Sequence, residues 1–274
     1  VEKLKKENHL DYTTGEVIVG TGGKQGVCNT ILALVNPGDE VIIPAPYWVS
    51  YPQMAKLAGA TPVIVRAGFE QDFKMTAEQL EAAITPKTKM LILCSPSNPT
   101  GSVYSQEELN ALAEVILKHE DMFVLSDEIY EHINYVGKAA SIASYPGMKE
   151  RTIICNGVSK AYAMTGWRLG WVAAPAWIVK GINKLQGQYT SGTCDVSQKA
   201  AVAAYVASQD CVEQMRVAFE RRRDLIVKLA KDIPGLEVNV PQGAFYLFPK
   251  CSSFFGKSDG ETAINNSTDF AMYI

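Results

Sequence analysis

Short apolar runs alternate with stretches of helical periodicity along the chain. The helices predicted at 76–85 and 105–119 each begin with a capping box, in which a threonine or serine is followed three residues later by glutamine or glutamate. The apolar runs predict strands at 40–44, 62–65, 89–94, 123–126, 152–156 and 169–173. Most of these runs are nearly continuously apolar, which is typical of parallel strands covered on both faces. The pattern therefore predicts a mostly parallel sheet flanked by helices.

The pattern changes near the C-terminal end of the chain. A long helical stretch runs from about 210 to 232 and is followed by the turn Pro234-Gly235. Two further runs, 236–240 and 244–248, predict strands. We expect a large domain at 1–215 and the start of a smaller α+β domain at 216–274.

Both ends of the sequence fall inside element-like patterns. Residues 1–8 are charged, with neither an initiator methionine nor a signal-peptide core, and residues 269–274 stop within an apolar helical pattern. We expect this chain to be part of a longer protein.

Composition narrows the classes of partner. A net charge of −3 and a pI near 5.7 provide no basic field for nucleic acid. No apolar run approaches the roughly 20 residues of a membrane span. The six cysteines lack C-x-x-C spacing and the three histidines form no H-x-x-x-H pair, so we expect no metal site and reduced thiols in a cytoplasmic protein. Small molecules are the expected ligands.

A glycine-rich segment, 20–26, precedes a helical pattern at 27–35. Gln25 stands where a dinucleotide fingerprint needs glycine and where a P-loop needs serine or threonine, so neither motif fits. The backbone around Gly23 and Lys24 would still present N–H groups to an anion at a positive helix end. A tight turn without a ligand explains the glycines equally well.

Two side chains follow predicted strands at the edge where open α/β sheets bind ligands. Trp48 offers an indole that can stack on a flat ring, although ordinary aromatic packing is the alternative. Asn98, in a turn with two prolines, can donate a hydrogen bond to an anionic oxygen, or can close an Asx-turn.

Four more residues complete a set that fits one cofactor, pyridoxal 5′-phosphate. Asp127 ends a strand, where pairing with a protonated pyridine nitrogen would offset the cost of its burial. Tyr130 follows three residues later, and its hydroxyl would reach the adjacent ring oxygen if the chain turns helically. Lys160 offers an amine for a Schiff base, and Arg168 offers a planar fork for a phosphate. Each residue alone has a structural explanation, but the set predicts a cofactor site.

These motifs resemble those of the class I aminotransferases of pyridoxal-phosphate fold type I. The intervals from Asn98 to Asp127, on to Tyr130 and to Lys160, and from Lys160 to Arg168 follow that family's order. The strings Met164–Arg168 and Pro46–Pro52 are similar to those of the aspartate aminotransferase subgroup, which includes bacterial aspartate and plant-type aspartate/glutamate-prephenate enzymes. The resemblance implies a three-layer α/β/α fold for the large domain.

The resemblance also implies roles at the cofactor. Lys160 would bond to it covalently and later move a proton, with Asp127 on the pyridine nitrogen and Trp48 stacked on the ring. Tyr130 and Asn98 would bind the ring oxygen. Arg168 and the backbone of Gly23 and Lys24 would bind the phosphate.

The implied reaction is a ping-pong transfer of an amino group between an amino acid and a 2-oxo acid. Lys24 would reach a side-chain carboxylate, with Trp48 and Asn98 as further substrate contacts, which favours aspartate or glutamate as the donor. Prephenate also carries a second carboxylate and stays an alternative. The resemblance further implies a homodimer.

The sequence also departs from the family pattern. The family commonly has a hydroxyl three residues before the lysine, where this chain has Gly157, so Ser159 becomes a substitute donor to the phosphate. The family's N-terminal arm would lie before Val1, and its arginine for the α-carboxylate beyond Ile274.

Three alternatives to a working aminotransferase follow. The chain would be a cofactor-binding fragment that transaminates poorly, an aminotransferase-like module of a transcription regulator, or a fold type I decarboxylase or lyase. The Met164–Arg168 string argues against the last of these.

Overall fold

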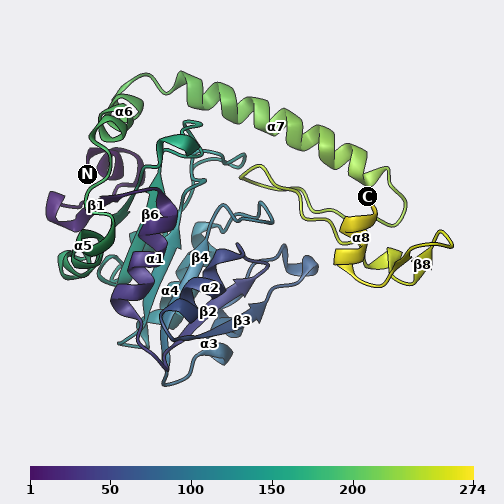
Figure 1. The fold of residues 1–274 in the computed structure, drawn as a ribbon, viewed down its shortest axis with the longest axis horizontal. Helices are drawn as coiled ribbons and strands as arrows, with labels where there is room; N and C mark the ends of the chain where they lie inside the picture. Colours follow the sequence, from purple (N-terminus) through teal and green to yellow (C-terminus); the bar gives the residue numbers. More distant parts are fainter.

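A seven-stranded sheet forms the centre of the molecule, in a computed structural model that describes residues 1–274 (Figure 1). The strand order is β1-β7-β6-β5-β4-β2-β3. The strands are β1 (Val17–Gly20), β2 (Glu40–Ala45), β3 (Thr61–Arg66), β4 (Thr88–Cys94), β5 (Phe123–Asp127), β6 (Thr152–Gly157) and β7 (Gly170–Ala173). The predicted strands agree with β2 to β7 to within a residue or two, whereas the short β1 was missed.

The sheet is parallel from β3 to β6 and antiparallel at β7. The pairs β2–β3, β2–β4, β4–β5 and β5–β6 are parallel. Strand β7 runs antiparallel to both β6 and β1, with Gly170 opposite Gly157 on one side and Gly20 on the other. The carboxyl ends of β4, β5 and β6 therefore meet the start of β7 at one edge of the sheet.

Helices cover both faces of the sheet and complete the three layers (Figure 1). On one face lie α1 (Gly23–Leu34), α2 (Ser50–Leu57) and α5 (Ala176–Tyr189), whose Ile31, Met54 and Ile182 share a core with the sheet. On the other lie α3 (Ala77–Ala83) and α4 (Gln106–Leu117), with a second core. Both capping boxes predicted from the sequence are present, at Thr76 and Ser105. The expected fold class is confirmed.

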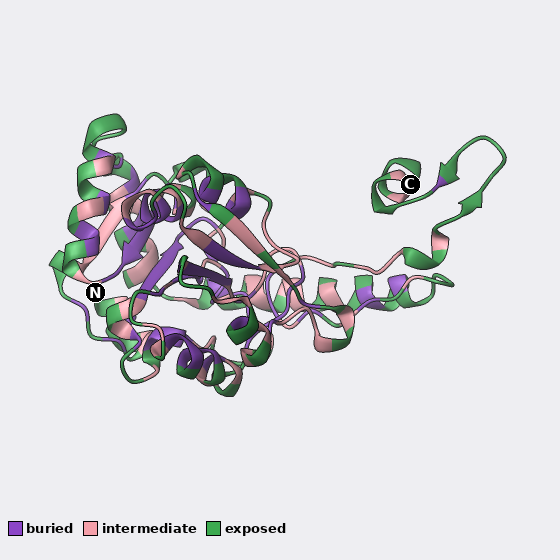
Figure 2. Ribbon diagram, turned by 90° about the horizontal axis from the view of Figure 1, so that it is seen from below, coloured by how far each residue is buried: buried purple, intermediate pink, exposed green.

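The C-terminal end of the chain lies apart from the sheet, as Figure 2 shows. Helix α6 (Asp195–Val206) leads to the 22-residue α7 (Asp210–Lys231), after which come β8 (Lys257–Ser258), β9 (Ala263–Ile264) and α8 (Ser267–Tyr273). None of the eight helices is both long enough and apolar enough to cross a membrane.

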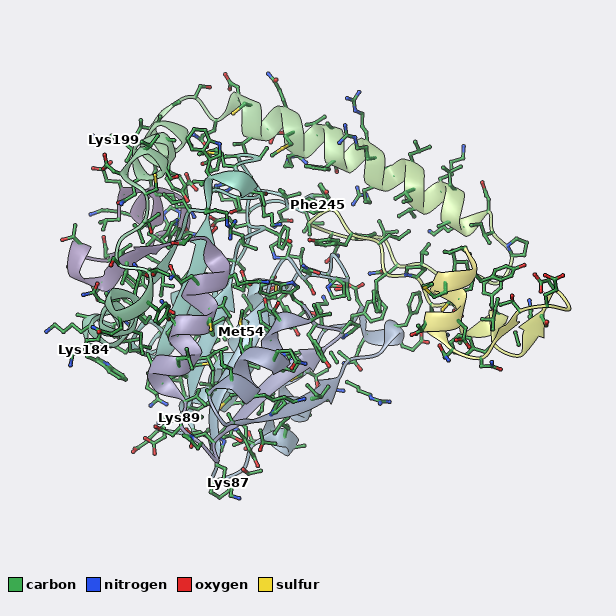
Figure 3. The ribbon with its side chains drawn as sticks, viewed as in Figure 1. Met54, Lys87, Lys89, Lys184, Lys199 and Phe245 are labelled. Carbon is green, nitrogen blue, oxygen red and sulfur yellow. The ribbon has the colours of Figure 1, made fainter.

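The strands predicted at 236–240 and 244–248 were wrong. Only isolated bridges form there, between Glu237 and Lys250 and between Asn134 and Gly243. The segment contains the apolar residues on which the prediction was based, but no neighbouring strand pairs with it. Figure 3 shows Phe245 on this segment, below the straight helix α7.

Candidate active site

One cavity of about 330 Å³ opens at the sheet edge where the strand ends converge. Cys94 and Asp127 are the last residues of β4 and β5, and Lys160 follows the end of β6. The cavity is lined by Gly23, Lys24, Trp48, Tyr51, Cys94, Asn98, Asp127, Ile129, Tyr130, Ser159, Lys160, Thr165, Arg168 and Tyr246. All nine residues predicted from the sequence as site residues are in this lining, while their roles toward a ligand stay predictions.

The amino end of α1 and Arg168 form a cradle suited to an anion. Helix α1 begins at Gly23, which follows Gly22 in a conformation with φ +86° that favours glycine. A Cβ added to Gly22 would lie 2.5 Å from a guanidinium nitrogen of Arg168. The unpaired N–H groups of the first turn of α1 thus lie next to the positive charge of the Arg168 guanidinium.

Arg168 is held in an unusual backbone conformation. Its φ of +50° is uncommon for a residue other than glycine and is often found at functional sites. Its Nη1 donates a 2.7 Å hydrogen bond to the carbonyl of Thr165. This bond fixes the direction of the guanidinium while leaving its remaining donors available.

Asp127 is buried at the floor of the cavity. The Tyr51 hydroxyl donates to its Oδ2 at 2.6 Å, and the N–H of Ile129 donates to Oδ1 at 3.3 Å. Burial raises the pKa of this carboxyl, and the hydrogen bond from Tyr51 counteracts the shift. A cationic group entering the cavity would stabilise the carboxylate further.

The amine of Lys160 lies near two aromatic rings. Its Nζ is 5.7 Å from the ring centroid of Tyr130 and 5.8 Å from that of Phe245. The residue is half-buried in the turn that follows β6, so its amine is accessible from the cavity without being freely solvated. Ser159 beside it is buried and also lines the cavity.

Asn98, Tyr130 and Tyr246 form a connected polar group. Nδ2 of Asn98 donates to the hydroxyl of Tyr246 at 3.3 Å, and the hydroxyls of Tyr130 and Tyr246 are 2.6 Å apart. Asn98 and Tyr130, which were both predicted to bind the ring oxygen of the cofactor, therefore share Tyr246 as a hydrogen-bond partner.

Lys24 and Trp48 face each other at the rim of the cavity. The ammonium of Lys24 lies 4.8 Å from the centroid of the Trp48 ring, within cation–π range. Trp48 also meets Tyr51 edge to face, with 5.3 Å between the ring centroids. The rim thus carries one cation and a flat aromatic surface.

Sequence reasoning missed five of the lining residues: Tyr51, Cys94, Ile129, Thr165 and Tyr246. Tyr51 stands three residues after Trp48, a spacing that places both on one side of a helix start. Nothing in the local pattern marks Tyr246, because it reaches the cavity from a distant part of the chain.

Steric crowding explains why position 157 is a glycine. A Cβ there would lie 2.7 Å from Cα of Gly170 and 2.8 Å from the carbonyl oxygen of Leu169. Any side chain, including a hydroxyl-bearing one, would push β6 and β7 apart.

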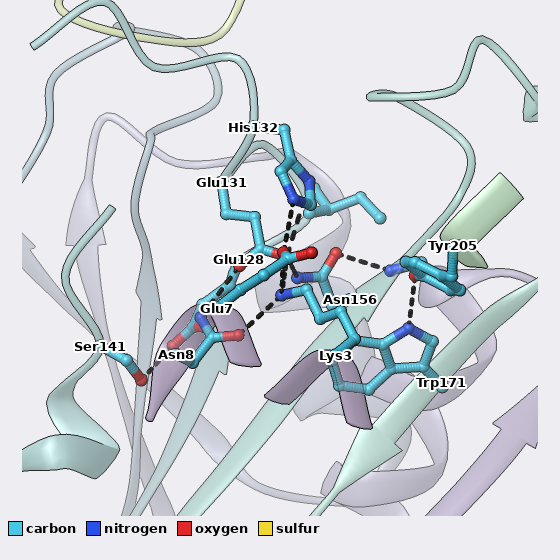
Figure 4. A network of polar contacts seen from close by, with 12 residues as sticks. Lys3, Glu7, Asn8, Glu128, Glu131, His132, Ser141, Asn156, Trp171 and Tyr205 are labelled. Atoms are coloured by element: carbon cyan, nitrogen blue, oxygen red, sulfur yellow. Dashed lines mark hydrogen bonds and ion pairs between the residues drawn. The ribbon is translucent and has the colours of Figure 1, made fainter. Parts of the chain in front are cut away.

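A polar network around Glu131 ties the N-terminal segment to the turn after β5 and to β6 (Figure 4). The carboxylate of Glu131 accepts hydrogen bonds from Lys3 and, at 3.1 Å, from Asn8. Nδ2 of Asn156 donates to the same carboxylate at 2.6 Å, and His132 pairs with Glu7 at 2.8 Å. The ammonium of Lys3 pairs with both carboxylates of this network, Glu131 and, at 3.7 Å, Glu7, and offsets part of their negative charge.

Comparisons with known proteins agree with this geometry. The family model "Aminotransferase class I and II" matches residues 1–264. A bifunctional aspartate aminotransferase and glutamate/aspartate-prephenate aminotransferase of Petunia hybrida is 50% identical over 99% of this chain and 58% of its own length. An aspartate/prephenate aminotransferase of Cereibacter sphaeroides is 49% identical over 98% of this chain and 68% of its own length.

Solved structures show the same similarity. The aspartate aminotransferase from Rhizobium meliloti superposes with a TM-score of 0.97 at 44% identity, over 99% of this chain and 69% of that one. An aspartate aminotransferase from Thermus thermophilus, solved with maleate, gives 0.89 at 39% identity, over 98% and 72%. The chain belongs to the class I and II aminotransferases.

Proposed function

We propose that this chain binds pyridoxal 5′-phosphate and transfers an amino group between aspartate or glutamate and a 2-oxo acid. The observation that carries the proposal is a single cavity. It brings together the buried carboxylate of Asp127, the amine of Lys160 and the anion cradle at Gly23 and Arg168.

The donor set fits that cofactor. A flat pyridinium ring needs an anionic partner for its nitrogen, and Asp127 is a buried carboxylate that needs a cation. A phosphate needs N–H donors and a guanidinium, which α1 and Arg168 provide together. Asn98 and Tyr130 would hold the ring oxygen, and Trp48 would cover the ring. A cavity of about 330 Å³ is within the range of small-molecule sites.

The bound cofactor supplies an electron sink that stabilises negative charge at the substrate's α-carbon. The chain's own residues bind and move protons around it. Asp127 would hold the ring nitrogen in its protonated form. Lys160, one of two amines in the cavity lining, would be the base that takes the proton from the α-carbon, passes it to the cofactor carbon that carries the transferred nitrogen, and reverses this transfer in the second half of the reaction. Arg168 and α1 would hold the phosphate in place, with Ser159 as a further donor to it.

Lys24 carries the argument for an acidic substrate. Its ammonium lies at the rim, over Trp48, where it can pair with a second carboxylate. The Thermus neighbour was solved with maleate, a dicarboxylate, and the names of the petunia and Cereibacter relatives include aspartate and prephenate. Prephenate is therefore the second candidate substrate, because it also carries two carboxylates.

A turnover assay tests the proposal. The purified chain, loaded with pyridoxal 5′-phosphate, is incubated with 2-oxoglutarate and either aspartate or leucine, and the 2-oxo acid product is measured. We expect turnover with aspartate that is lost in Lys160→Ala. No transfer from aspartate, or equal transfer in the variant, would contradict the proposal. Glutamate with prephenate as acceptor tests the second candidate.

We further propose a domain division, a dimer and a compartment for this chain. Residues 1–215 and 216–274 form separate domains, since Val227, Ala230 and Val238 make a small core of their own in the second part.

The chain pairs as a homodimer, since α6 exposes Val196, Val202 and Val206. It works in the cytoplasm, a reducing compartment, since all six cysteines are free. Sedimentation of the native chain against Val202→Glu tests the dimer.

A further inference from the structure

Tyr246 connects the two side chains that would hold the cofactor's ring oxygen. Its hydroxyl lies 2.6 Å from that of Tyr130 and accepts a 3.3 Å hydrogen bond from Asn98. It is half-buried and lines the cavity, yet it follows the long helix α7, more than a hundred residues after either partner. A distant segment therefore completes this part of the site.

Main-chain hydrogen bonds hold that segment against both loops. The N–H groups of Gln242 and Gly243 each donate to the carbonyl of Gly101 at 2.8 Å, on the Asn98 loop. The N–H of Ala244 donates at 2.7 Å to the carbonyl of Ile133, next to the Tyr130 turn. Tyr246 is thus held in place relative to both partners.

Close packing fixes the position of the segment as well. A Cβ added to Gly243 would lie 2.6 Å from Cβ of Pro96, on the Asn98 loop. The Tyr246 ring also meets the rings of Tyr130 and Phe245, with centroids 5.7 and 4.9 Å away. The hydroxyl therefore has little freedom to leave its two partners.

The number of available protons sets the direction of these bonds. The amide nitrogen of Asn98 can only donate, so the Tyr246 oxygen accepts from it. Burial raises the pKa of both tyrosines, so both keep their protons at neutral pH. If Tyr246 gives its one proton to the Tyr130 oxygen, the proton of Tyr130 stays free to point into the cavity.

We propose that Tyr246 is a positioning residue that accepts from Asn98, donates to Tyr130 and thereby directs the Tyr130 proton onto the ring oxygen of the bound cofactor. The inference rests on the proposed function. A chain of hydrogen bonds polarises each member, so the last donor in the chain is a stronger one. A stronger donor stabilises the anionic form of the ring oxygen.

The colour of the bound cofactor reports on this relay, because the visible absorbance of a pyridoxal chromophore depends on its protonation. The native chain and Tyr246→Phe are loaded with pyridoxal 5′-phosphate and titrated with pH. We expect the variant's midpoint to rise by roughly 0.3–0.7 of a pH unit, since a weakened donor favours the protonated chromophore. Phenylalanine keeps the aromatic packing, and circular dichroism checks the fold.

Two further variants separate the relay from a loosened segment. Tyr135 donates its hydroxyl proton to the Ala244 carbonyl, so it anchors the same segment without lining the cavity. Tyr135→Phe should leave the midpoint unchanged. Tyr130→Phe should raise it further, and adding Tyr246→Phe to that variant should change nothing more, because Tyr246 acts through Tyr130.

Each contrary outcome identifies what fails. An unchanged midpoint in Tyr246→Phe, an equal rise in Tyr135→Phe, or additive rises in the double variant would each overturn the relay while leaving the cofactor assignment intact. A native chain that develops no bound visible band would overturn the proposed function, and the relay with it.

Discussion

The hydroxyl of Tyr51 donates a 2.6 Å hydrogen bond to the buried carboxylate of Asp127. Tyr51 is itself fully packed under Trp48 at the start of α2, so this donor cannot turn away. The bond favours the charged form of Asp127 against the burial that raises its pKa. Tyr51 thereby helps to keep a negative charge at the floor of the cavity.

Removing that hydroxyl should weaken cofactor binding. In Tyr51→Phe the Asp127 carboxylate loses a bond to a charged acceptor, which is worth about 1.5–3 kcal/mol. We expect the dissociation constant for pyridoxal 5′-phosphate to rise at least about tenfold, measured by equilibrium dialysis. Tyr145→Phe removes a hydroxyl from the surface and is the control. Equal affinities for the native chain and Tyr51→Phe would show that Tyr51 does not support Asp127.

Lys24 should control the choice of substrate rather than the chemistry. Lys24→Met removes the rim cation while keeping a long apolar side chain over Trp48. We expect kcat/KM for aspartate to fall by roughly 10–100-fold, as for the loss of an ion pair, and that for leucine to change little. Parallel losses for both amino acids would place Lys24 in cofactor binding instead.

Gly170 should be intolerant of any side chain. A Cβ there would lie 2.3 Å from the backbone nitrogen of Gly23, directly behind the anion cradle. Gly170→Ala should cost about 1–3 kcal/mol of unfolding free energy in urea and weaken phosphate binding. Gly187→Ala, on α5 with nothing within 4 Å, should instead add about 0.5–1 kcal/mol. Equal stability of the two variants would refute the steric argument.

Glu128 should make stability fall as pH rises. Its burial, together with the neighbouring Glu131, raises its pKa to about 7, although Ser141 and Ser126 both donate to it. The folded chain therefore binds this proton more tightly than the unfolded chain. The resulting stabilisation is full below about pH 4.5 and is lost as pH rises through about 7.

The variant Glu128→Gln tests that dependence, because glutamine accepts the same bonds without ionising. We expect it to exceed the native chain by roughly 2–4 kcal/mol at pH 8 and by about 1 kcal/mol or less at pH 5 in urea unfolding. Glu120→Gln, which removes an exposed charge, is the control. A difference that is the same at both pH values would contradict the assignment.

The sequence was most informative where neighbouring residues determine the structure. Continuous apolar runs predicted β2 to β7, because buried parallel strands need both faces apolar. The capping boxes at Thr76 and Ser105 fixed two helix starts by local hydrogen bonds. Asp127 and Lys160 were predicted to share one site because they belong to a set of side chains that the cofactor needs and because their spacing follows the family's order, and both line one cavity.

The sequence was least informative where distant segments meet. The apolar pattern at 244–248 predicted a strand, whereas main-chain bonds to Gly101 and Ile133 hold the segment across two loops. Local periodicity cannot reveal such pairing. Tyr246 was missed for that reason, and the short β1 was missed because its pairing with β7 comes from a strand about 150 residues away.

The attachment point of pyridoxal 5′-phosphate tests the proposed cofactor site most directly. The chain is incubated with the cofactor, reduced with borohydride to make any bond to an amine permanent, digested and analysed by mass spectrometry. We expect the phosphopyridoxyl mass on the peptide that contains Lys160. Label on Lys24, label scattered over surface lysines, or no label would contradict it.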